Sequence, residues 1–245
     1  MLQIKKLKKY FGGVKAVDGA TFNVKENSIT ALIGPNGSGK TTVFNLISGI
    51  LKAETGRILM DKEEITNLRP YIVSNKGISR LFQQSRLFNN LTVKDNLLIA
   101  IDNEDTFFWR NFFRANRITA EKENKVRQML ELVNMEKFEK RIARELSYGQ
   151  KRLIEIARTI LNPHKLLMLD EPVAGVNPKL RTEIAKLLLK LKKQKETILL
   201  IEHDMNFTLK IADHVIVMDE GKVIAEGKPE HIKKNKKVLE AYLGE

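Results

Sequence analysis

Cysteine is absent from the 245 residues of the sequence, so disulfide bonds and thiolate-bound metal sites are excluded. Long hydrophobic runs are absent too, because no apolar stretch reaches the roughly 18 residues that a membrane-spanning helix needs. The first residues, MLQIKKLKKYFGG, lack the pattern of a secretory signal peptide. These absences lead us to expect a cytoplasmic protein.

Acidic residues are outnumbered, since 43 Lys and Arg against 30 Asp and Glu give a formal net charge of +13. This charge has three interpretations. The protein could bind nucleic acid, it could be attracted to anionic lipid, or its lysines could simply be solvated at the surface without a partner. The lysines are spread over 5–9, 186–195 and 233–237 rather than gathered beside aromatic residues. We therefore expect no nucleic-acid partner.

Three short apolar runs have the character of parallel strands that are buried on both faces. They are TALIGP at 30–35, LLMLDEP at 166–172 and TILLIEH at 197–203. The segment HVIVMDEGKVIAEG predicts a β-hairpin, and FNVKENSITALIG predicts a second pair of strands near the start. With helical patterns between the strands, the fold class is α/β with a mixed sheet.

Residues 92–159 differ from both flanks because helical patterns replace strand patterns there. The patterns are TVKDNLLIAI, AEKENKVRQMLELV and SYGQKRLIEIARTIL. We expect a helical subdomain at 92–159, inserted into an α/β core made of 1–91 and 160–245, within a single domain of 1–245.

A glycine-rich loop, GPNGSGKT at 34–41, follows an apolar strand and precedes a helical pattern, as a P-loop requires. Its glycines let backbone N–H groups close around phosphate oxygens. Lys40 can neutralise the β- and γ-phosphates, and the Thr41 hydroxyl can ligate Mg²⁺. The loop predicts that ATP and Mg²⁺ are bound by Gly34, Pro35, Asn36, Gly37, Ser38, Gly39, Lys40, Thr41 and Thr42.

The segment LLMLDEP contains two carboxylates, since Asp170 ends the apolar run and Glu171 follows it. Asp170 can hold the Mg²⁺ shell, and Glu171 can polarise an attacking water. His203 ends a third apolar run. The phosphate loop, the two carboxylates and His203 are therefore expected together at the edge of the sheet where α/β proteins bind ligands. Together they predict a site that hydrolyses nucleotide.

A second anion site is expected at ELSYGQKRLIEIAR, residues 145–158. Ser147 is placed to N-cap a basic, amphipathic helix, and the first-turn N–H groups of such a helix can bind an anion. The order of phosphate loop, Gln83, LSYGQ, LLMLDEP and IEH resembles that of ABC-type ATP-binding subunits over essentially the whole chain.

This resemblance implies a P-loop NTPase (RecA-like) core with an antiparallel β subdomain and an inserted helical subdomain. It also implies that two such subunits bind ATP face to face. In that arrangement the signature residues of one subunit would grip the γ-phosphate held by the Lys40 of the other. Those residues are Ser147, Gly149 and Gln150.

The resemblance implies further roles for residues outside the phosphate loop. Gln83 would sense Mg²⁺ and the attacking water, and His203 would hold the γ-phosphate and the water in line. Phe11 would stack on adenine, with Tyr10 as the alternative. Residues 174–177 would form the loop that crosses the dimer.

Two residues depart from the family pattern. Tyr148 replaces the first glycine of the usual Leu-Ser-Gly-Gly-Gln signature, and Asn177 stands where the cross-dimer loop usually has aspartate. A tyrosine N–H can still serve if the ring points away from the phosphate, although a glycine-only conformation is excluded. Neither change removes a phosphate ligand.

A narrower resemblance, through LSYGQKRLIEIAR, EPVAGVNP, IEHDM and AYLGE, is to the ATPases of branched-chain amino-acid importers. It implies a peripheral subunit on the inner face of the cell membrane, with permease partners and a second, identical or different, ATPase subunit. The ATPases of urea or amide importers and of lipopolysaccharide export are alternatives.

A soluble ABC ATPase acting on nucleic acid or ribosomes is a weaker alternative, because such proteins usually join two cassettes or carry coiled coils or zinc cysteines. A small-molecule P-loop kinase would lack LSYGQ. The aromatic stretch at 104–119 has two interpretations, a contact with permease or lipid and a local hydrophobic cluster, of which we favour the second.

Overall fold

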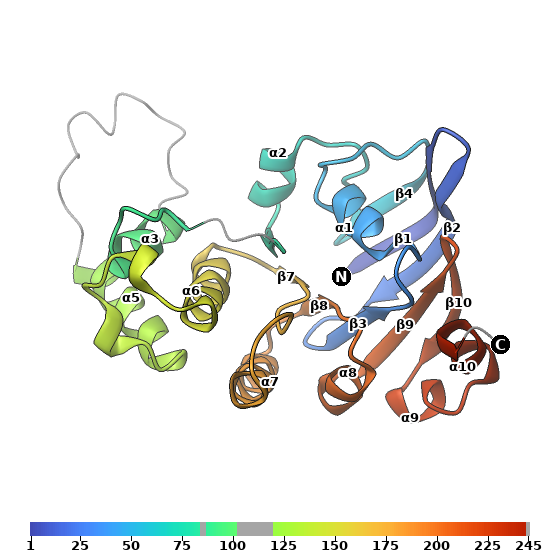
Figure 1. The fold of residues 1–245 in the computed structure, drawn as a ribbon. Coiled ribbons are helices and arrows are strands. Elements are labelled where there is room, and N and C mark those ends of the chain that lie inside the picture. Colours follow the sequence, from blue (N-terminus) through green and yellow to red (C-terminus); the bar gives the residue numbers. More distant parts are fainter. Residues whose placement is uncertain (84–86, 102–119, 244–245) are drawn as a thin grey trace. The chain divides into compact units, whose positions relative to one another are not determined.

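The computed structural model describes residues 1–83, 87–101 and 120–243, so the aromatic stretch at 104–119 lies outside the described residues. The chain forms two compact units (Figure 1). The first consists of Met1–Arg80, Lys165–Glu171 and Leu188–Glu245, and the second of Leu81–His164 and Pro172–Leu187. The described helices of the stretch 92–159 all belong to the second unit.

The central element is a six-stranded sheet with strand order β10-β9-β3-β8-β7-β6. Its strands are β3 (Ile29–Ile33), β6 (Ile78–Leu81), β7 (Leu166–Asp170), β8 (Ile198–Ile201), β9 (His214–Asp219) and β10 (Lys222–Gly227). The pairs β3·β8, β3·β9 and β7·β8 are parallel, whereas β9 and β10 form an antiparallel hairpin. The expected α/β class with a mixed sheet is therefore confirmed, as is the hairpin.

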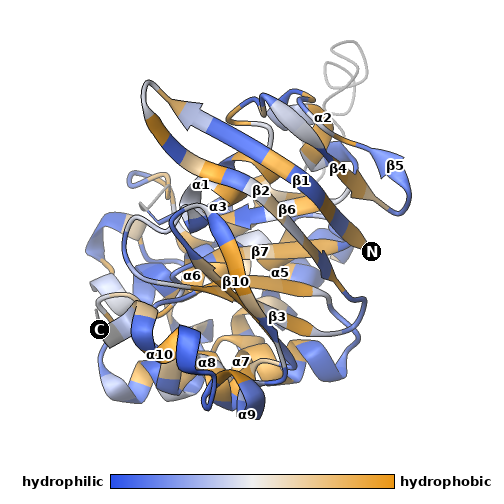
Figure 2. Ribbon diagram, turned by 90° about the vertical axis from the view of Figure 1, so that its right-hand side faces the viewer, coloured by the Kyte–Doolittle hydropathy of each residue, from blue (hydrophilic) through white to orange (hydrophobic). Residues whose placement is uncertain are grey.

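The three apolar runs form β3, β7 and β8, in which every residue is buried. Continuous burial explains their continuous hydrophobicity, because a strand that is covered on both faces has no side chain exposed to water. Figure 2 shows the contrast between the largely hydrophobic β7 and the alternating bands of β1.

The second sheet is four-stranded and antiparallel, with strand order β2-β1-β4-β5. Its strands are β1 (Leu2–Phe11), β2 (Val14–Val24), β4 (Thr55–Met60) and β5 (Glu63–Glu64). This sheet confirms the antiparallel β subdomain that the family resemblance implied.

The prediction that FNVKENSITALIG forms a strand pair was wrong. Both of its apolar parts are strands, but β2 pairs with β1, whereas β3 pairs with β8 and β9. Burial alternates along Ala20–Val24, as on one face of an antiparallel sheet, and is complete along β3. Two strands with such different surroundings belong to different sheets, and the intervening turn at 25–28 connects them.

Between the two sheets lies the larger hydrophobic core of the first unit, to which helix α1 (Lys40–Ile47) contributes the fully buried Phe44. A smaller cluster joins the opposite face of the six-stranded sheet to the C-terminal helices. Outside the stretch 92–161, the other α-helices of the described residues are α2 (Pro70–Asn75), α7 (Pro178–Lys193), α8 (Met205–Ile211), α9 (Pro229–Ile232) and α10 (Lys236–Leu243). No helix among the described residues is both long enough and apolar enough to span a membrane.

The second unit is mainly helical, with α3 (Val93–Ile101) packed against α5 (Ala120–Leu132) and α6 (Tyr148–Leu161). The fully buried Asn96 orders the loop before α3. Its amide accepts a hydrogen bond from the Phe88 N–H (2.8 Å) and donates to the carbonyls of Phe88 (3.1 Å) and Thr92 (2.9 Å). This network satisfies the buried amide and fixes the loop from Phe88 to Thr92.

Candidate nucleotide-binding site

The phosphate loop joins β3 to α1, as its flanking patterns predicted (Figure 1). Gly34 and Gly39 have positive φ values of 152° and 98°. A Cβ at these positions would collide with the carbonyls of Met218 and Ala16, respectively. Only glycine therefore fits at both points, which explains why the loop is built from this residue.

Lys40 lies folded over this loop and is only 7% exposed. Its ammonium donates hydrogen bonds to the carbonyls of Gly34 (2.9 Å) and Pro35 (2.8 Å) and to the Ser38 hydroxyl (3.2 Å). Burial lowers the pKa of Lys40, while the negative charges of Glu171 and Asp170 oppose that shift. A buried cation whose hydrogen bonds go to neutral oxygens is suited to bind an anion.

The start of α1 is a second anion-binding feature of the loop. No side chain caps this helix at Gly39, and no acidic residue lies in its first turn. The first-turn N–H groups and the helix dipole therefore favour a phosphate there. The exposed Thr41 and half-buried Thr42 belong to the same turn.

The two carboxylates at the end of β7 have different surroundings. Asp170 is 2% exposed, whereas Glu171 follows with a left-handed φ of 46°. The Glu171 N–H donates to the Ile201 carbonyl (3.0 Å), and this bond helps to hold the unusual backbone conformation. Strained backbone of this kind is common where a catalytic side chain must be aimed.

The structure brings His203 to Glu171, with 3.7 Å between Nδ1 of the histidine and Oε1 of the glutamate. His203 follows β8 and is exposed, and the Glu171 side chain is 21% exposed. Both side chains can therefore contact a water molecule at the edge of the sheet where β3 leads into the phosphate loop. The sequence predicted this arrangement, because β3, β8 and β7 are neighbouring parallel strands whose ends meet at one edge.

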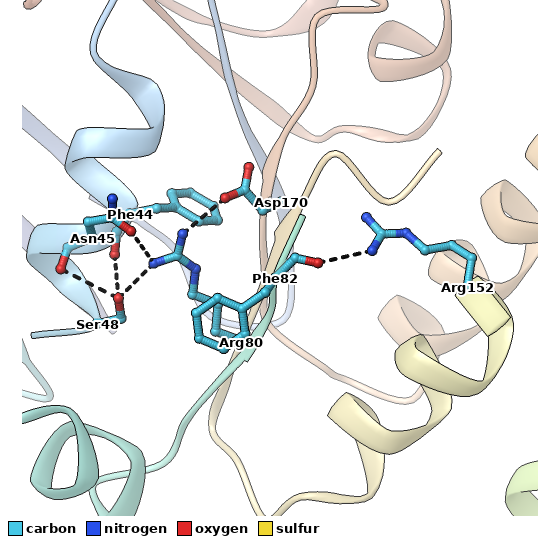
Figure 3. Close-up of polar contacts among 7 residues, drawn as sticks. All are labelled: Phe44, Asn45, Ser48, Arg80, Phe82, Arg152 and Asp170. Carbon is cyan, nitrogen blue, oxygen red and sulfur yellow. Dashed lines mark hydrogen bonds and ion pairs between the residues drawn. The ribbon is translucent and has the colours of Figure 1, made fainter. Parts of the chain in front are cut away.

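Arg80 contacts this site and was missed by the sequence analysis. Its Nη2 donates to Oδ2 of Asp170 (3.0 Å), and its Nη1 donates to Asn45 Oδ1 and Ser48 Oγ, at 2.8 Å each (Figure 3). A charged residue inside the apolar strand ISRL was the signal that could have identified it, because a buried arginine requires partners.

A second arginine, Arg152 of α6, connects separate segments of the second unit by hydrogen bonds (Figure 3). It is 3% exposed and donates to the carbonyls of Phe82 (3.0 Å) and Pro172 (3.2 Å). Its charge is paired with Glu155 at 3.2 Å. Arg152 thus holds the backbone just before Gln83, which is itself exposed.

Ser147 caps α6, which confirms the expectation from the sequence. Its hydroxyl accepts from the Gln150 N–H (3.4 Å), and the Gln150 side chain accepts in return from the Ser147 N–H (2.9 Å). This capping box was readable in the Ser-x-x-Gln spacing but was not identified. Because a hydroxyl both accepts and donates, Ser147 can cap its helix and still donate to a phosphate.

The two departures from the family pattern both have structural roles in the second unit. The Tyr148 hydroxyl donates to the Ala174 carbonyl (3.1 Å), and its ring lies against Gly175. The ring therefore points along the loop at 174–177 rather than across the start of its own helix. Asn177 caps α7, since its side-chain oxygen accepts from the Leu180 N–H (2.9 Å).

Two aromatic residues were candidates for stacking on adenine. Phe11 ends β1 and is 47% exposed, with Lys9 Nζ 5.2 Å from the centre of its ring. The Tyr10 hydroxyl instead donates to Asp18 (3.0 Å). The free ring face of Phe11 is thus better suited to stacking than Tyr10.

The side chains fit a magnesium ion that is carried by a nucleotide rather than by the protein alone. Among the described residues, no group of three or more His, Cys, Asp or Glu side chains forms a metal cluster. Mg²⁺ keeps several waters and commonly binds one or two protein ligands together with substrate phosphates. The Thr41 hydroxyl and the Asp170 carboxylate are oxygen ligands of this kind.

Comparison with known proteins gives consistent matches along the chain. The protein-family model described as ABC transporter matches residues 17–174. A second family model, described as branched-chain amino acid ATP-binding cassette transporter, matches residues 222–245. The chain is 41% identical to the high-affinity branched-chain amino acid transport ATP-binding protein BraF of Pseudomonas aeruginosa, covering 100% of this chain and 98% of BraF. It is 40% identical to a probable branched-chain amino acid transport ATP-binding protein, LivG, of Archaeoglobus fulgidus, covering 100% of this chain and 95% of LivG.

Solved structures agree with these matches. A nucleotide-free ATP-binding cassette from an ABC transporter and the ADP conformation of MJ1267, an ATP-binding cassette, each align with a TM-score of 0.87. Each is 37% identical and covers 100% of this chain and 99% of its own. The dimeric structure of the bacterial ABC transporter cassette MJ0796 aligns with a TM-score of 0.79 at 25% identity, covering 94% of this chain and 99% of its own.

Proposed function

Since this chain belongs to the ABC transporter family, as an ATP-binding and ATP-hydrolysing cassette, we propose that it powers the import of branched-chain amino acids. The observation that carries this proposal is the match of residues 222–245 to the branched-chain amino-acid group, because the phosphate loop and carboxylates are common to the wider family. Two relatives described as branched-chain amino acid transport ATP-binding proteins, one bacterial and one archaeal, match over 98% and 95% of their own length and support it.

The phosphate-binding step uses the loop and the start of α1. Backbone N–H groups from Gly34 to Thr42 surround the phosphates, and Lys40 moves its hydrogen bonds from loop carbonyls to phosphate oxygens. Thr41 and Asp170 would hold Mg²⁺, with Gln83 as a further ligand. When bound, the ion neutralises charge on the β- and γ-phosphate oxygens.

Hydrolysis is carried out by Glu171, which follows β7, and His203, which follows β8. Glu171 accepts a proton from the water as the water oxygen bonds to the γ-phosphorus, and His203 orients that water. The bond from the γ-phosphorus to the bridging oxygen breaks, which leaves ADP and phosphate. The 3.7 Å separation of Glu171 and His203 allows both side chains to contact one water.

A second subunit, identical or different, completes the site in this proposal. Ser147, Gly149 and Gln150 of one subunit bind the γ-phosphate on the other, because an N-terminal helix turn presents N–H groups and partial positive charge. The dimeric state of the cassette MJ0796 supports this arrangement. Permease subunits are the proposed membrane partners, which places the protein at the inner face of the membrane.

A mixture of two inactive variants tests whether the signature acts on the other subunit. Ser147→Arg and Lys40→Met are each expected to hydrolyse no ATP, because each homodimer lacks one essential part at both sites. Their heterodimer has one intact site, so an equal mixture should recover about a quarter of the wild-type rate. Phosphate release measures this recovery, and its absence would indicate that each signature serves its own subunit.

The transported solute is tested by ATP-driven uptake in proteoliposomes. The chain is reconstituted with permease subunits encoded in the same genome, and we expect radiolabelled leucine to be taken up and competed by valine and isoleucine. Transport of urea without leucine would make the substrate proposal wrong but leave the ATPase assignment intact. A lipid flux out of the membrane would instead favour the export alternative.

A further inference from the structure

Arg80 is a cation within a hydrophobic strand. Its side chain is 6% exposed in β6, where the neighbouring Ser79 and Leu81 are also buried. Removing a guanidinium from water is costly unless its N–H groups are well paired. The identity of its partners therefore indicates what this arginine is for.

The partners of Arg80 come from two different elements of the nucleotide site (Figure 3). Nη2 binds the carboxylate of Asp170 on β7, and Nη1 binds Asn45 and Ser48 at the far end of α1. The guanidinium also lies 5.5 Å from the centre of the Phe44 ring, which favours a cation. A planar fork can hold two elements at once, which a lysine ammonium cannot do with the same geometry.

The same helix begins with Lys40 and Thr41. An eight-residue helix is rigid over this length, so fixing its last turn also fixes the position of its first turn. Arg80 thereby sets the position of the Thr41 hydroxyl relative to the Asp170 carboxylate. These are two of the side chains that are proposed to hold Mg²⁺.

We propose that Arg80 is a positioning residue for magnesium, which acts by holding Asp170 and α1 in the arrangement that Mg²⁺–nucleotide requires. The inference rests on the nucleotide site proposed above. Residues that orient metal ligands through hydrogen bonds commonly change metal affinity by about 10- to 100-fold when they are replaced. A buried ion pair with only a structural role would alter stability without altering this affinity.

The test is a titration with Mg²⁺ of the full chain bound to a fluorescent, non-hydrolysable ATP analogue. For Arg80→Gln we expect the apparent Kd for Mg²⁺ to rise by about 10- to 100-fold. Binding of the analogue in EDTA should stay within about twofold of wild type, because Lys40 is held by hydrogen bonds within the phosphate loop itself. Arg57→Gln is the matched control, since Arg57 is exposed and pairs with Glu64 at 4.0 Å.

Two further variants keep the inference falsifiable if Arg80→Gln does not fold. Ser48→Ala removes one anchor on α1 and leaves the ion pair, so a smaller rise in the Kd for Mg²⁺ is expected. In an Asp170→Asn background, Arg80→Lys should change the Kd for Mg²⁺ by a smaller factor than it does in the wild-type chain, because the link to the Asp170 carboxylate is already lost. Additive effects in this double-mutant cycle would overturn the inference.

The outcomes also separate this role from the proposed function. A wild-type chain that does not bind the analogue would overturn both the nucleotide site and the role of Arg80, whereas one that binds it with no dependence on Mg²⁺ would overturn the role of Arg80 alone. A normal wild-type titration that is unchanged in every Arg80 and Ser48 variant would overturn the role of Arg80 alone.

Discussion

Glu171→Gln is expected to lower ATP hydrolysis by about two to four orders of magnitude and to leave ATP binding nearly unchanged. Glutamine has the same shape but cannot accept the proton of the attacking water. The substitution keeps the Cβ and the backbone N–H, so the bond to Ile201 and the left-handed conformation at φ 46° are retained. The chemical step is lost while the site keeps its shape.

Phosphate release measures the rate of this variant, and a fluorescent ATP analogue measures its affinity. Because ATP is bound but not hydrolysed, Glu171→Gln should also elute as a dimer on a sizing column only when ATP is present. Glu63→Gln is the control, since Glu63 is an exposed carboxylate paired with Lys76 at 2.6 Å. Near-normal turnover of Glu171→Gln would show that another group accepts the proton.

Lys40→Met is expected to weaken ATP binding by about 10- to 100-fold and to abolish measurable hydrolysis. Hydrogen bonds to charged groups contribute about 1.5–3 kcal/mol each, and Lys40 supplies the only side-chain cation proposed for the β- and γ-phosphates. Methionine has a similar length and is apolar, so it fills the space of the buried lysine stem. The change removes charge with little change of volume.

The comparison of ATP with adenosine tests the origin of this loss. Lys40→Met should weaken ATP strongly and adenosine hardly at all, because adenosine has no phosphate to contact the ammonium. Calorimetry of both ligands measures the two affinities. Lys165→Met is the control, because Lys165 is a surface lysine that pairs with Asp61 at 3.1 Å. An equal loss for both ligands would instead indicate collapse of the loop.

The parts of the fold that the sequence predicted correctly are those with a local signal. A continuous apolar run is sufficient to identify β3, β7 and β8, because burial on both faces leaves no polar position. The phosphate loop is local as a sequence pattern, since its glycines and lysine lie within eight residues, although the carbonyls that require glycine at 34 and 39 belong to Met218 and Ala16. The N-cap at Ser147 depends only on its own first turn.

The parts that the sequence did not predict depend on partners far along the chain. Arg80 is 35 residues from Asn45 and 90 residues from Asp170, so no local pattern identifies this cluster. The pairing of β2 was mistaken for a similar reason, because neighbouring strands need not share a sheet. The left-handed backbone at Glu171 is also set by tertiary structure, as the bond to Ile201 indicates.

The contact between Tyr148 and the loop at 174–177 is made within one chain. A transporter with two different ATPase chains would therefore have this contact once for each chain that carries the tyrosine. With glycine in the other chain, the loop at 174–177 would be anchored by a side-chain hydrogen bond in one subunit and would lack it in the other.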